Sequence, residues 1–333
     1  MDDATPVTQD ALGRLTALLE AELQATNREI IARMHSPVAL IPQLAAHIVA
    51  AGGKRMRPLL TLATAKLCGY QGERQVKLAA CVEFIHTATL LHDDVVDESL
   101  LRRGFASANA VFGNKASVLV GDFLFARAFE LMVEDGALEV LGILSAASAT
   151  IAEGEVLQLT TQNDISTTPQ TYFDVIKGKT AALFAAAAEV GGVIAGVSAQ
   201  DQTALRSFGM DLGMAFQLVD DALDYAADQA ELGKTVGDDF REGKLTYPVI
   251  LAVAEATADE RQFWTRTLEQ SEQTEADLAT ALKLIDKYNA TARTIAKADE
   301  FIVNAVNTLA RFPQNDVREA LAAVARYTTA RRH

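Results

Sequence analysis

The sequence predicts an all-α protein. Only 7 prolines and 20 glycines interrupt 333 residues, the Ala-rich runs are long, and alternating patterns of β-branched residues are rare. Hydrophobic residues make up 50% of the chain, and no Gly/Ser-rich linker or break in composition divides it. We therefore expect one helical domain over residues 1–333, in which residues 1–8 form an N-terminal tail.

Start and stop signals delimit the helices. Pro58 opens a segment that stops at Gly69, and Pro169 opens a longer pattern that ends at Gly191. Proline suits the first turn of a helix because the N–H that it lacks would have no partner there. The helices expected in chain order are residues 9–34, 38–51, 58–68, 73–99, 115–134, 136–160, 169–190, 200–227, 244–256, 258–269, 273–289, 291–310 and 315–330.

The composition indicates a cytoplasmic protein. The acidic N-terminus lacks the basic start and apolar stretch of a secretory signal. The longest apolar stretches, residues 140–152 and 180–188, are shorter than the ~20 residues that span a bilayer. We expect them to be buried core helices, and the protein not to be an integral membrane protein. Cys68 and Cys81 have no partner at metal spacing, which favours buried structural thiols.

The net charge of −14 argues against a nucleic-acid surface, because duplex binding needs clustered Lys and Arg. An acidic protein can still bind an anion where divalent cations lie between its carboxylates and the ligand.

Two aspartate motifs with the same spacing suggest such a site. The first lies in LLHDDVVDESLLRRG, residues 90–104, and the second in QLVDDALDYA, residues 217–226. Residues four apart project from one face of a helix, and paired carboxylates suit Mg²⁺, which is usually held by one or two carboxylates plus substrate phosphates. A solvated acidic face is the alternative, but each motif follows an apolar approach. The candidate metal ligands are Asp93, Asp94, Asp97, Asp220, Asp221 and Asp224.

Basic residues near these motifs are candidates for neutralising a metal-bridged diphosphate. Lys54, Arg55 and Arg57 follow a glycine pair before a predicted helix, and helix N-termini favour anions. His86 lies roughly two turns before Asp93 on the same face. The remaining cations are Arg102, Arg103, Lys179, Lys234 and Lys244.

These motifs together resemble the trans-polyprenyl (all-E) diphosphate synthases of the long-chain type. The similarity covers nearly the whole chain. Its segments are GGKRMRP at 52–58, HTATLLHDDVVDESLLRRG at 86–104, GDFLFARAF at 121–129, GEVLQL at 154–159, KGKTAALF at 177–184, FQLVDDALDY at 216–225 and GKTVGDDFREGKLTYP at 233–248. The resemblance implies a helical bundle with a deep central cavity that works as a homodimer. It also implies a Mg²⁺-dependent, head-to-tail condensation of isopentenyl diphosphate with an allylic diphosphate.

The family's roles carry over by motif. The six aspartates would hold up to three Mg²⁺ ions on the allylic diphosphate, assisted by Arg102, Lys179, Lys234 and Lys244. Lys54, Arg57, His86 and Arg103 would hold the diphosphate of isopentenyl diphosphate. Gln158, Thr180 and Gln217 would face the allylic carbocation. One departure is Ala106, where many relatives have proline, in a loop expected to cover the site.

Small residues before the first motif predict a long product. In the family, a bulky aromatic four or five positions before the first aspartate blocks the tunnel for the growing chain, whereas this sequence has Thr89 and Ala88 there, with Ile85 on the same face. The tunnel floor is expected near Phe125, Phe129 or Met132. We expect a product of about eight to ten isoprene units, with ten favoured, for a quinone side chain such as that of ubiquinone.

Other functions fit the motifs less well. A terpene cyclase would not need a second diphosphate site, and a non-catalytic partner subunit would lack some of these aspartates or arginines. A lipid or metal carrier would not explain two basic clusters. A shorter-chain synthase, making geranylgeranyl or farnesyl diphosphate, is the main alternative within the family.

Overall fold

The computed structural model describes residues 11–50, 53–102, 104–226 and 236–330. Its helices and strands are α1 (Ala11–Leu18), α2 (Glu20–Arg33), α3 (Leu40–Ala50), α4 (Met56–Leu67), α5 (Arg74–Val96), β1 (Leu101–Arg102), β2 (Phe105–Ala106), α6 (Ala108–Phe112), α7 (Asn114–Asp135), α8 (Leu138–Thr161), α9 (Pro169–Ile176), the π-helix η1 (Lys177–Ala181), α10 (Ala182–Ile194), α11 (Ala199–Leu223), α12 (Asp238–Arg241), α13 (Tyr247–Ala254), α14 (Ala258–Trp264), the π-helix η3 (Thr265–Glu269), α15 (Asp277–Lys287), α16 (Ala290–Leu309) and α17 (Asp316–Ala330). The predicted all-α class is confirmed.

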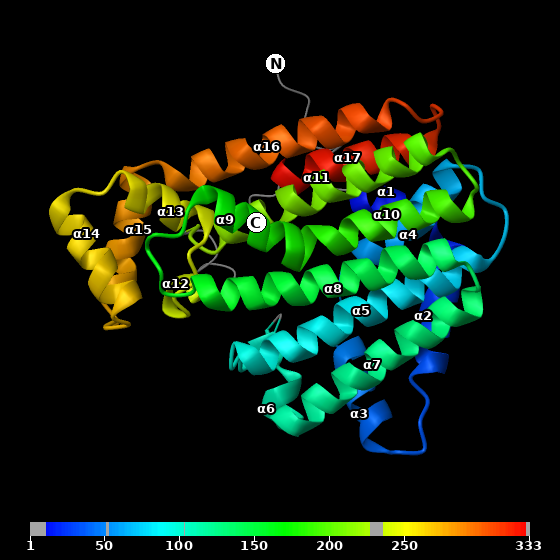
Figure 1. Cartoon of the computed structure of the whole chain (residues 1–333), viewed down its shortest axis with the longest axis horizontal. Helices are drawn as coiled ribbons and strands as arrows, with labels where there is room; N and C mark the ends of the chain where they lie inside the picture. Colours follow the sequence, from blue (N-terminus) through cyan, green and yellow to red (C-terminus); the bar gives the residue numbers. More distant parts are fainter. Residues whose placement is uncertain (1–10, 51–52, 103, 227–235, 331–333) are drawn as a thin grey trace.

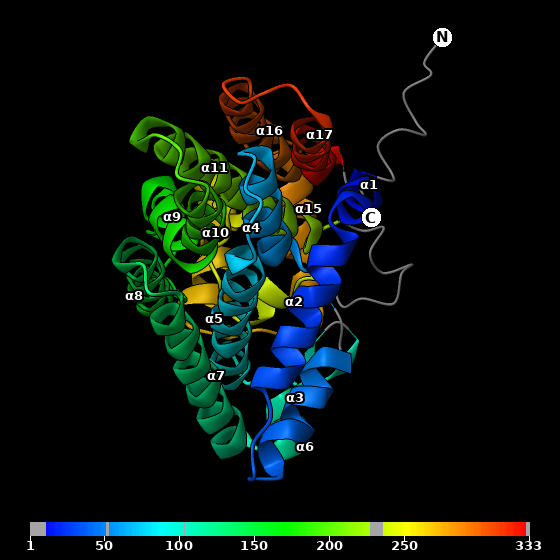
Figure 2. The ribbon, with the colours of Figure 1, turned by 90° about the vertical axis from the view of Figure 1, so that its right-hand side faces the viewer.

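The long helices form a bundle around a buried central helix. In Figure 1, the axes of the long helices are roughly aligned, whichever way the chain runs along them; these helices are α5, α7, α8, α10, α11 and α16. The shorter helices α13, α14 and α15 gather at one end. Figure 2 shows the same bundle from the side. The central helix is α10, which packs on α4, α8 and α11 and has nearly all of its side chains buried. Its alanines allow the surrounding helices to approach closely.

Several predicted helices differ from the observed ones for local reasons. The segment 9–34 is two helices, because buried Leu19 leaves the helical conformation with φ −122° and ψ 15°. The helix predicted over 73–99 ends at Val96, where three aspartates of one motif crowd the negative end of the helix dipole. The β1–β2 hairpin follows directly. Neither α6 nor α12 was predicted, since both are too short to show a period.

The apolar segment 140–152 is not the buried core helix that was expected. It lies in α8, and only 28% of that helix's apolar window is buried in the chain. Val140, Leu144, Ala147 and Ile151 form its buried stripe. Among the described residues, α8 is the one helix long and apolar enough to cross a bilayer by length and composition.

Two glycines let α8 and η1 meet at backbone contact. A Cβ added at Gly154 of α8 would lie 2.5 Å from the backbone nitrogen of Lys179, and one added at Gly178 would lie 2.9 Å from the Cα of Gly154. Because the obstructing atoms belong to the backbone, the two helices would have to separate. This contact fixes where Lys179 and Thr180 project.

We predict that Gly154→Ala destabilises the protein by about 1–3 kcal/mol, as overpacking does, and lowers its thermal midpoint. Gly142→Ala in the same helix is the matched control, because a Cβ there meets nothing within 4 Å. That change should be neutral or stabilise by up to about 1 kcal/mol through helix propensity. Thermal unfolding followed by circular dichroism compares the two, and equal midpoints would contradict the close-contact argument.

Candidate active site

Both aspartate motifs face one cavity of about 720 Å³. Asp93 and Asp97 come from the end of α5, and Asp220 comes from α11. Residues 53–57 and the π-helix η1 complete the wall. The predicted residues that line the cavity are Lys54, Arg57, His86, Thr89, Asp93, Asp97, Arg102, Lys179, Thr180, Gln217, Asp220 and Lys244. The predictions for Arg103 and Lys234 fall outside the described residues.

Lysines from distant segments face the cavity carboxylates of the first motif. Lys244 Nζ lies 2.8 Å from Asp97 Oδ2, and Lys179 Nζ lies 3.9 Å from Asp93 Oδ2 and 2.8 Å from Glu155 Oε2. Burial raises the pKa of Asp93, Lys179 opposes the shift, and the charge of Asp97 adds to it. Burial likewise raises the pKa of Glu155 to about 7, with Asp93 contributing. Burial is the largest cause of both shifts, so a cation bound beside these carboxylates would favour their ionised forms.

Asp94 points to the other side of α5. It is 2% exposed, and its Oδ1 accepts a hydrogen bond of 2.7 Å from Arg102 Nε. Arg102 belongs to β1, so this ion pair ties the hairpin to the end of α5. Asn109 adds a hydrogen bond of 2.9 Å to the backbone oxygen of Asp94.

Residues 54–57, which lead into α4, present a basic group to the same cavity. Arg57 Nη1 lies 2.9 Å from His86 Nε2, and its guanidinium lies 4.5 Å from the centre of the Phe184 ring. Arg55 has a left-handed backbone with φ 49° and pairs with Glu83 of α5. Lys54 is exposed at the mouth. These residues surround a position suited to a second anion.

The other two aspartates of the second motif are engaged within the protein. Asp221 accepts hydrogen bonds from Tyr172 and Gln217, and burial raises its pKa to about 6. The carboxylate of Asp224 accepts the backbone N–H groups of Asp238 at 3.3 Å and Asp239 at 3.1 Å. Asp220 is exposed and lines the large cavity.

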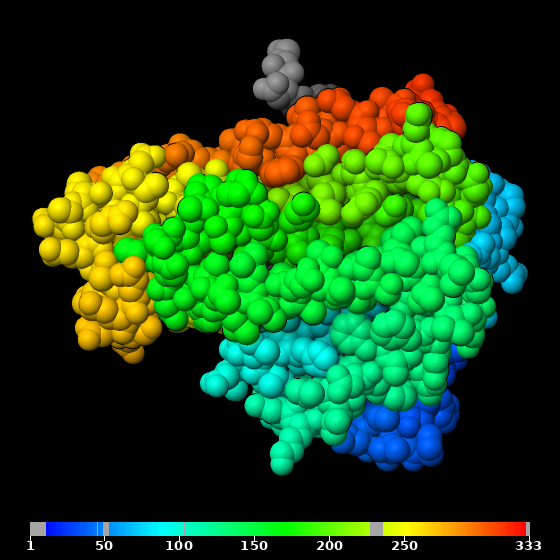
Figure 3. Space-filling model, viewed as in Figure 1, coloured from blue at the N-terminus to red at the C-terminus, as the bar shows by residue number. Residues whose placement is uncertain are grey.

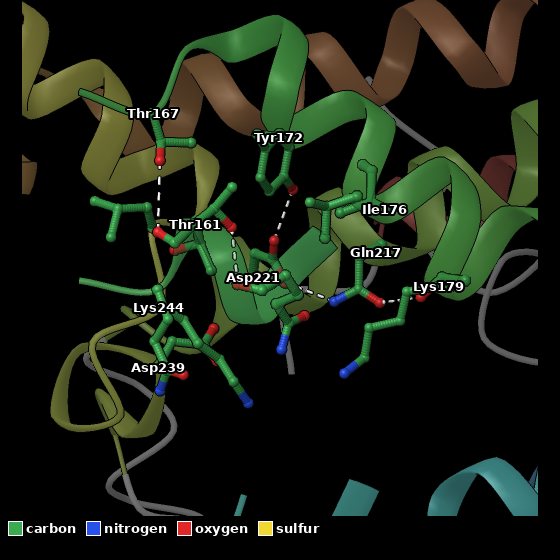
Figure 4. A pocket seen from close by; sticks show the side chains of 15 residues that line it. Thr161, Thr167, Tyr172, Ile176, Lys179, Gln217, Asp221, Asp239 and Lys244 are labelled. Atoms are coloured by element: carbon green, nitrogen blue, oxygen red, sulfur yellow. Dashed lines mark hydrogen bonds between the residues drawn. The ribbon is translucent and has the colours of Figure 1, made fainter. Parts of the chain in front are cut away.

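A smaller cavity of about 100 Å³ adjoins the large one and shares Lys179, Thr180, Gln217 and Lys244 with it (Figure 4). Gln158 lines this smaller cavity together with Asp221 and Asp239. All three predicted dipolar residues therefore line the smaller cavity; Thr180 and Gln217 also line the large one, whereas Gln158 does not.

The predicted chain-length residues occupy different environments. Thr89 lines the large cavity, and its hydroxyl donates to the His86 backbone oxygen at 2.8 Å. Ile85, Ala88 and Met132 are at most 1% exposed and pack in the core. Of the other predicted floor residues, Phe125 stacks on His92, and Phe129 is 45% exposed on this chain. Ala106, at the predicted departure from the family, accepts a hydrogen bond of 2.8 Å from His47 Nε2 through its backbone oxygen.

Four residues that sequence reasoning missed also build the site. Glu155 precedes Gln158 by one turn in GEVLQL, so its spacing was a usable signal. Glu83 precedes His86 in the same way. Tyr172 and Asp239 reach the site through the fold, and no spacing marks them.

The donor set fits a divalent cation that is bound together with diphosphate. Within the described parts of the chain, no three His, Cys, Asp or Glu side chains are close enough to hold a metal ion alone. Mg²⁺ commonly takes one or two carboxylates and completes its shell with phosphate oxygens and water. The raised pKa of Asp93 marks an acidic group that a cation would stabilise.

Residues 38–285 match the family model of the polyprenyl synthetases. The chain is 45% identical over 314 residues to an octaprenyl diphosphate synthase of Escherichia coli (strain K12), covering 94% of this chain and 97% of that protein. A decaprenyl diphosphate synthase structure from Rhodobacter capsulatus superimposes with a TM-score of 0.93 at 52% identity, covering 96% of this chain and 98% of that one.

A polyprenyl synthase from Caulobacter crescentus CB15, complexed with calcium and isoprenyl diphosphate, also gives a TM-score of 0.93, at 53% identity, covering 97% of this chain and 98% of that one. The resemblance inferred from the motifs is thereby confirmed. This chain belongs to the polyprenyl synthetase family.

Proposed function

We propose that this protein is a long-chain trans-polyprenyl diphosphate synthase. The observation that carries the proposal is the cavity in which Asp93, Asp97 and Asp220 meet one set of cations, with a second basic group at residues 54–57. One substrate diphosphate and its metal ions fit the first arrangement, and a second diphosphate fits the other. The octaprenyl and decaprenyl synthases among the similar proteins support a long product.

The reaction begins with loss of diphosphate from the allylic substrate. The C–O bond breaks, and diphosphate leaves with the electron pair, so negative charge develops where Lys179, Lys244 and Arg102 converge. When bound by Asp93, Asp97 and Asp220, Mg²⁺ would supply further charge neutralisation at the leaving group. The ammonium groups now held by Glu155 and Asp97 can turn to phosphate oxygens.

Carbon–carbon bond formation follows. The oxygens of Thr180 and Gln217 stabilise the allylic cation, and Lys54, Arg57 and His86 orient isopentenyl diphosphate so that its double bond attacks. A proton then leaves the new carbocation. We assign no side-chain base to this step and take the released diphosphate as the proton acceptor.

The product is proposed to contain about eight to ten isoprene units, by analogy with the octaprenyl, nonaprenyl and decaprenyl synthases similar to this chain. We favour ten. A prenyl group of this length suits the side chain of a quinone. We propose that this protein makes the group for that use and does so in the cytoplasm.

We propose that the enzyme is a homodimer with α7 and α8 at its interface. Both helices lie on the face seen in Figure 3. They expose Leu119 (67%), Val133 (68%), Leu138 (83%), Val156 (61%) and Leu159 (50%), and large apolar side chains exposed together on neighbouring helices are typical of a protein interface. A second copy of the chain would bury this set.

The first prediction from the proposed function concerns the enzyme activity. Incubation with Mg²⁺, farnesyl diphosphate and radiolabelled isopentenyl diphosphate, followed by dephosphorylation and chromatography, should give prenols ending at about eight to ten units. EDTA should abolish incorporation, and Asp93→Asn should lower it by orders of magnitude without unfolding the protein. Failure of the folded wild type to incorporate label with Mg²⁺ present would favour a non-catalytic partner subunit.

A second prediction tests the cavity wall. Thr89→Phe should shorten the dominant product by several units, because the ring would project into the cavity that Thr89 lines. Ala88→Phe should shorten it as well, with added destabilisation from overpacking of a fully buried position. Thr89→Val is the control of similar volume and should leave the product unchanged. An unaltered product from Thr89→Phe would refute the proposed path of the hydrocarbon.

The proposed interface gives a third prediction. Val156→Lys should shift the protein from dimer to monomer in light scattering coupled to size exclusion, because the charge would be buried at the interface. Val303→Lys in α16 is the control, since Val303 is 57% exposed away from α7 and α8. A monomeric wild type that floats with lipid vesicles would instead assign the apolar face to a membrane.

A further inference from the structure

A chain of hydrogen bonds ends on Asp221. The hydroxyl of Thr180 donates to Gln217 Oε1 at 2.7 Å, and Gln217 Nε2 donates to Asp221 Oδ1 at 2.7 Å. The hydroxyl of Tyr172 donates to Asp221 Oδ2 at 2.6 Å. Figure 4 shows Tyr172, Asp221 and Gln217 pointing toward one another. The four residues come from three elements, η1, α9 and α11.

Both oxygens of Asp221 are thus used inside the protein. The residue is 4% exposed and lines the smaller cavity but not the large one. Tyr172 holds it in this direction, because its ring is buried and packs on Phe173 and Tyr247 with centroids 5.5 Å away in each case. To bind a metal in the large cavity, Asp221 would have to give up these hydrogen bonds.

The chain also fixes which end of the Gln217 amide faces which neighbour. An ionised carboxylate only accepts hydrogen bonds, so the –NH₂ group of Gln217 must point to Asp221. The carbonyl oxygen must then point the other way, toward Thr180. This assignment follows from the chemistry of the partners, although the two ends of an amide look alike in shape.

The orientation matters because Thr180 and Gln217 line the large cavity beside Lys179 and Asp220. A carbonyl oxygen presents partial negative charge, which stabilises a cationic carbon nearby. A reversed amide would present N–H groups, whose partial positive charge would raise the energy of that carbon. The orientation of the Gln217 amide therefore sets the electrostatic potential at the place where the allylic substrate ionises.

We propose that Asp221 and Tyr172 are positioning residues that hold the carbonyl oxygen of Gln217 toward the reacting allylic carbon. The proposal rests on the proposed function, since it assumes an allylic cation. It changes the role expected for Asp221 from its spacing.

The first measurement tests whether Asp221 binds the metal or orients the Gln217 amide. Mg²⁺ is titrated by calorimetry into each variant with inorganic diphosphate present, so that metal affinity is read without turnover. Asp220→Asn should weaken Mg²⁺ binding about tenfold or more, as loss of a metal ligand does. Asp221→Asn and Tyr172→Phe should bind Mg²⁺ within about twofold of wild type. Loss of affinity in Asp221→Asn equal to that in Asp220→Asn would overturn the proposal.

Steady-state kinetics then test the coupling through Gln217. Asp221→Asn should lower kcat about tenfold or more with little change in KM, and Tyr172→Phe should lower it less. In a Gln217→Ala background the Asp221→Asn effect should fall below about twofold, because residues that act through one group are not additive. Additive effects would contradict the proposal.

Tyr247→Phe is the matched control, because it removes a hydroxyl from the same aromatic stack outside this chain of hydrogen bonds, and it should leave kcat unchanged. If Asp221→Asn does not fold, Tyr172→Phe still tests the proposal, since it removes only one oxygen atom. A wild type that fails to transfer prenyl groups would refute the proposed function, whereas a wild type that is active, with additive variants, would refute only this inference.

Discussion

Repulsion among carboxylates that face one cavity is the constraint on which this structure depends. Asp93 and Asp97 lie at the negative end of the α5 dipole, and Asp220 faces them from α11. Several negative charges close together in a partly buried cavity destabilise the folded protein unless cations lie nearby. The chain brings Lys179 and Lys244 from distant segments for this purpose. Divalent ions bound between these carboxylates and a diphosphate would offset the repulsion further.

The same constraint explains the ends of several elements. Arg102 anchors the hairpin after α5 by pairing with Asp94, so the motif both ends a helix and fixes the hairpin that follows it. Asp224 accepts two backbone N–H groups at the start of α12, which brings the segment before Lys244 into place. Aspartates of one motif thus serve separate purposes according to the side of the helix that they occupy.

The helical class, most helix positions and the residues of the main cavity were predictable from the sequence, because start signals such as Pro169 and the four-residue spacing of Asp93 and Asp97 are local. The separation of roles within a motif was not. Asp93 and Asp94 are adjacent in sequence but face a cavity and a hairpin, respectively. Tyr172 and Asp221 are 49 positions apart in the sequence, and no periodic pattern predicts that they form a hydrogen bond. The exposed face of α8 also escaped prediction, because composition alone does not distinguish a buried helix from one with an exposed apolar face.

The π-helix η1 has a consequence for how this chain can vary in length. It adds residues to a turn between α9 and α10, and one residue more or less changes the phase of a helix by about 100°. The helix after it is buried on nearly all sides, whereas Lys179 and Thr180 must face the cavity. Deletion of one residue from η1 would turn either the buried face of α10 out of the core or Lys179 and Thr180 away from the cavity. The length of the segment Lys177–Ala181 is therefore fixed, and its wider turn acts as a spacer between the buried helix and the residues of the cavity.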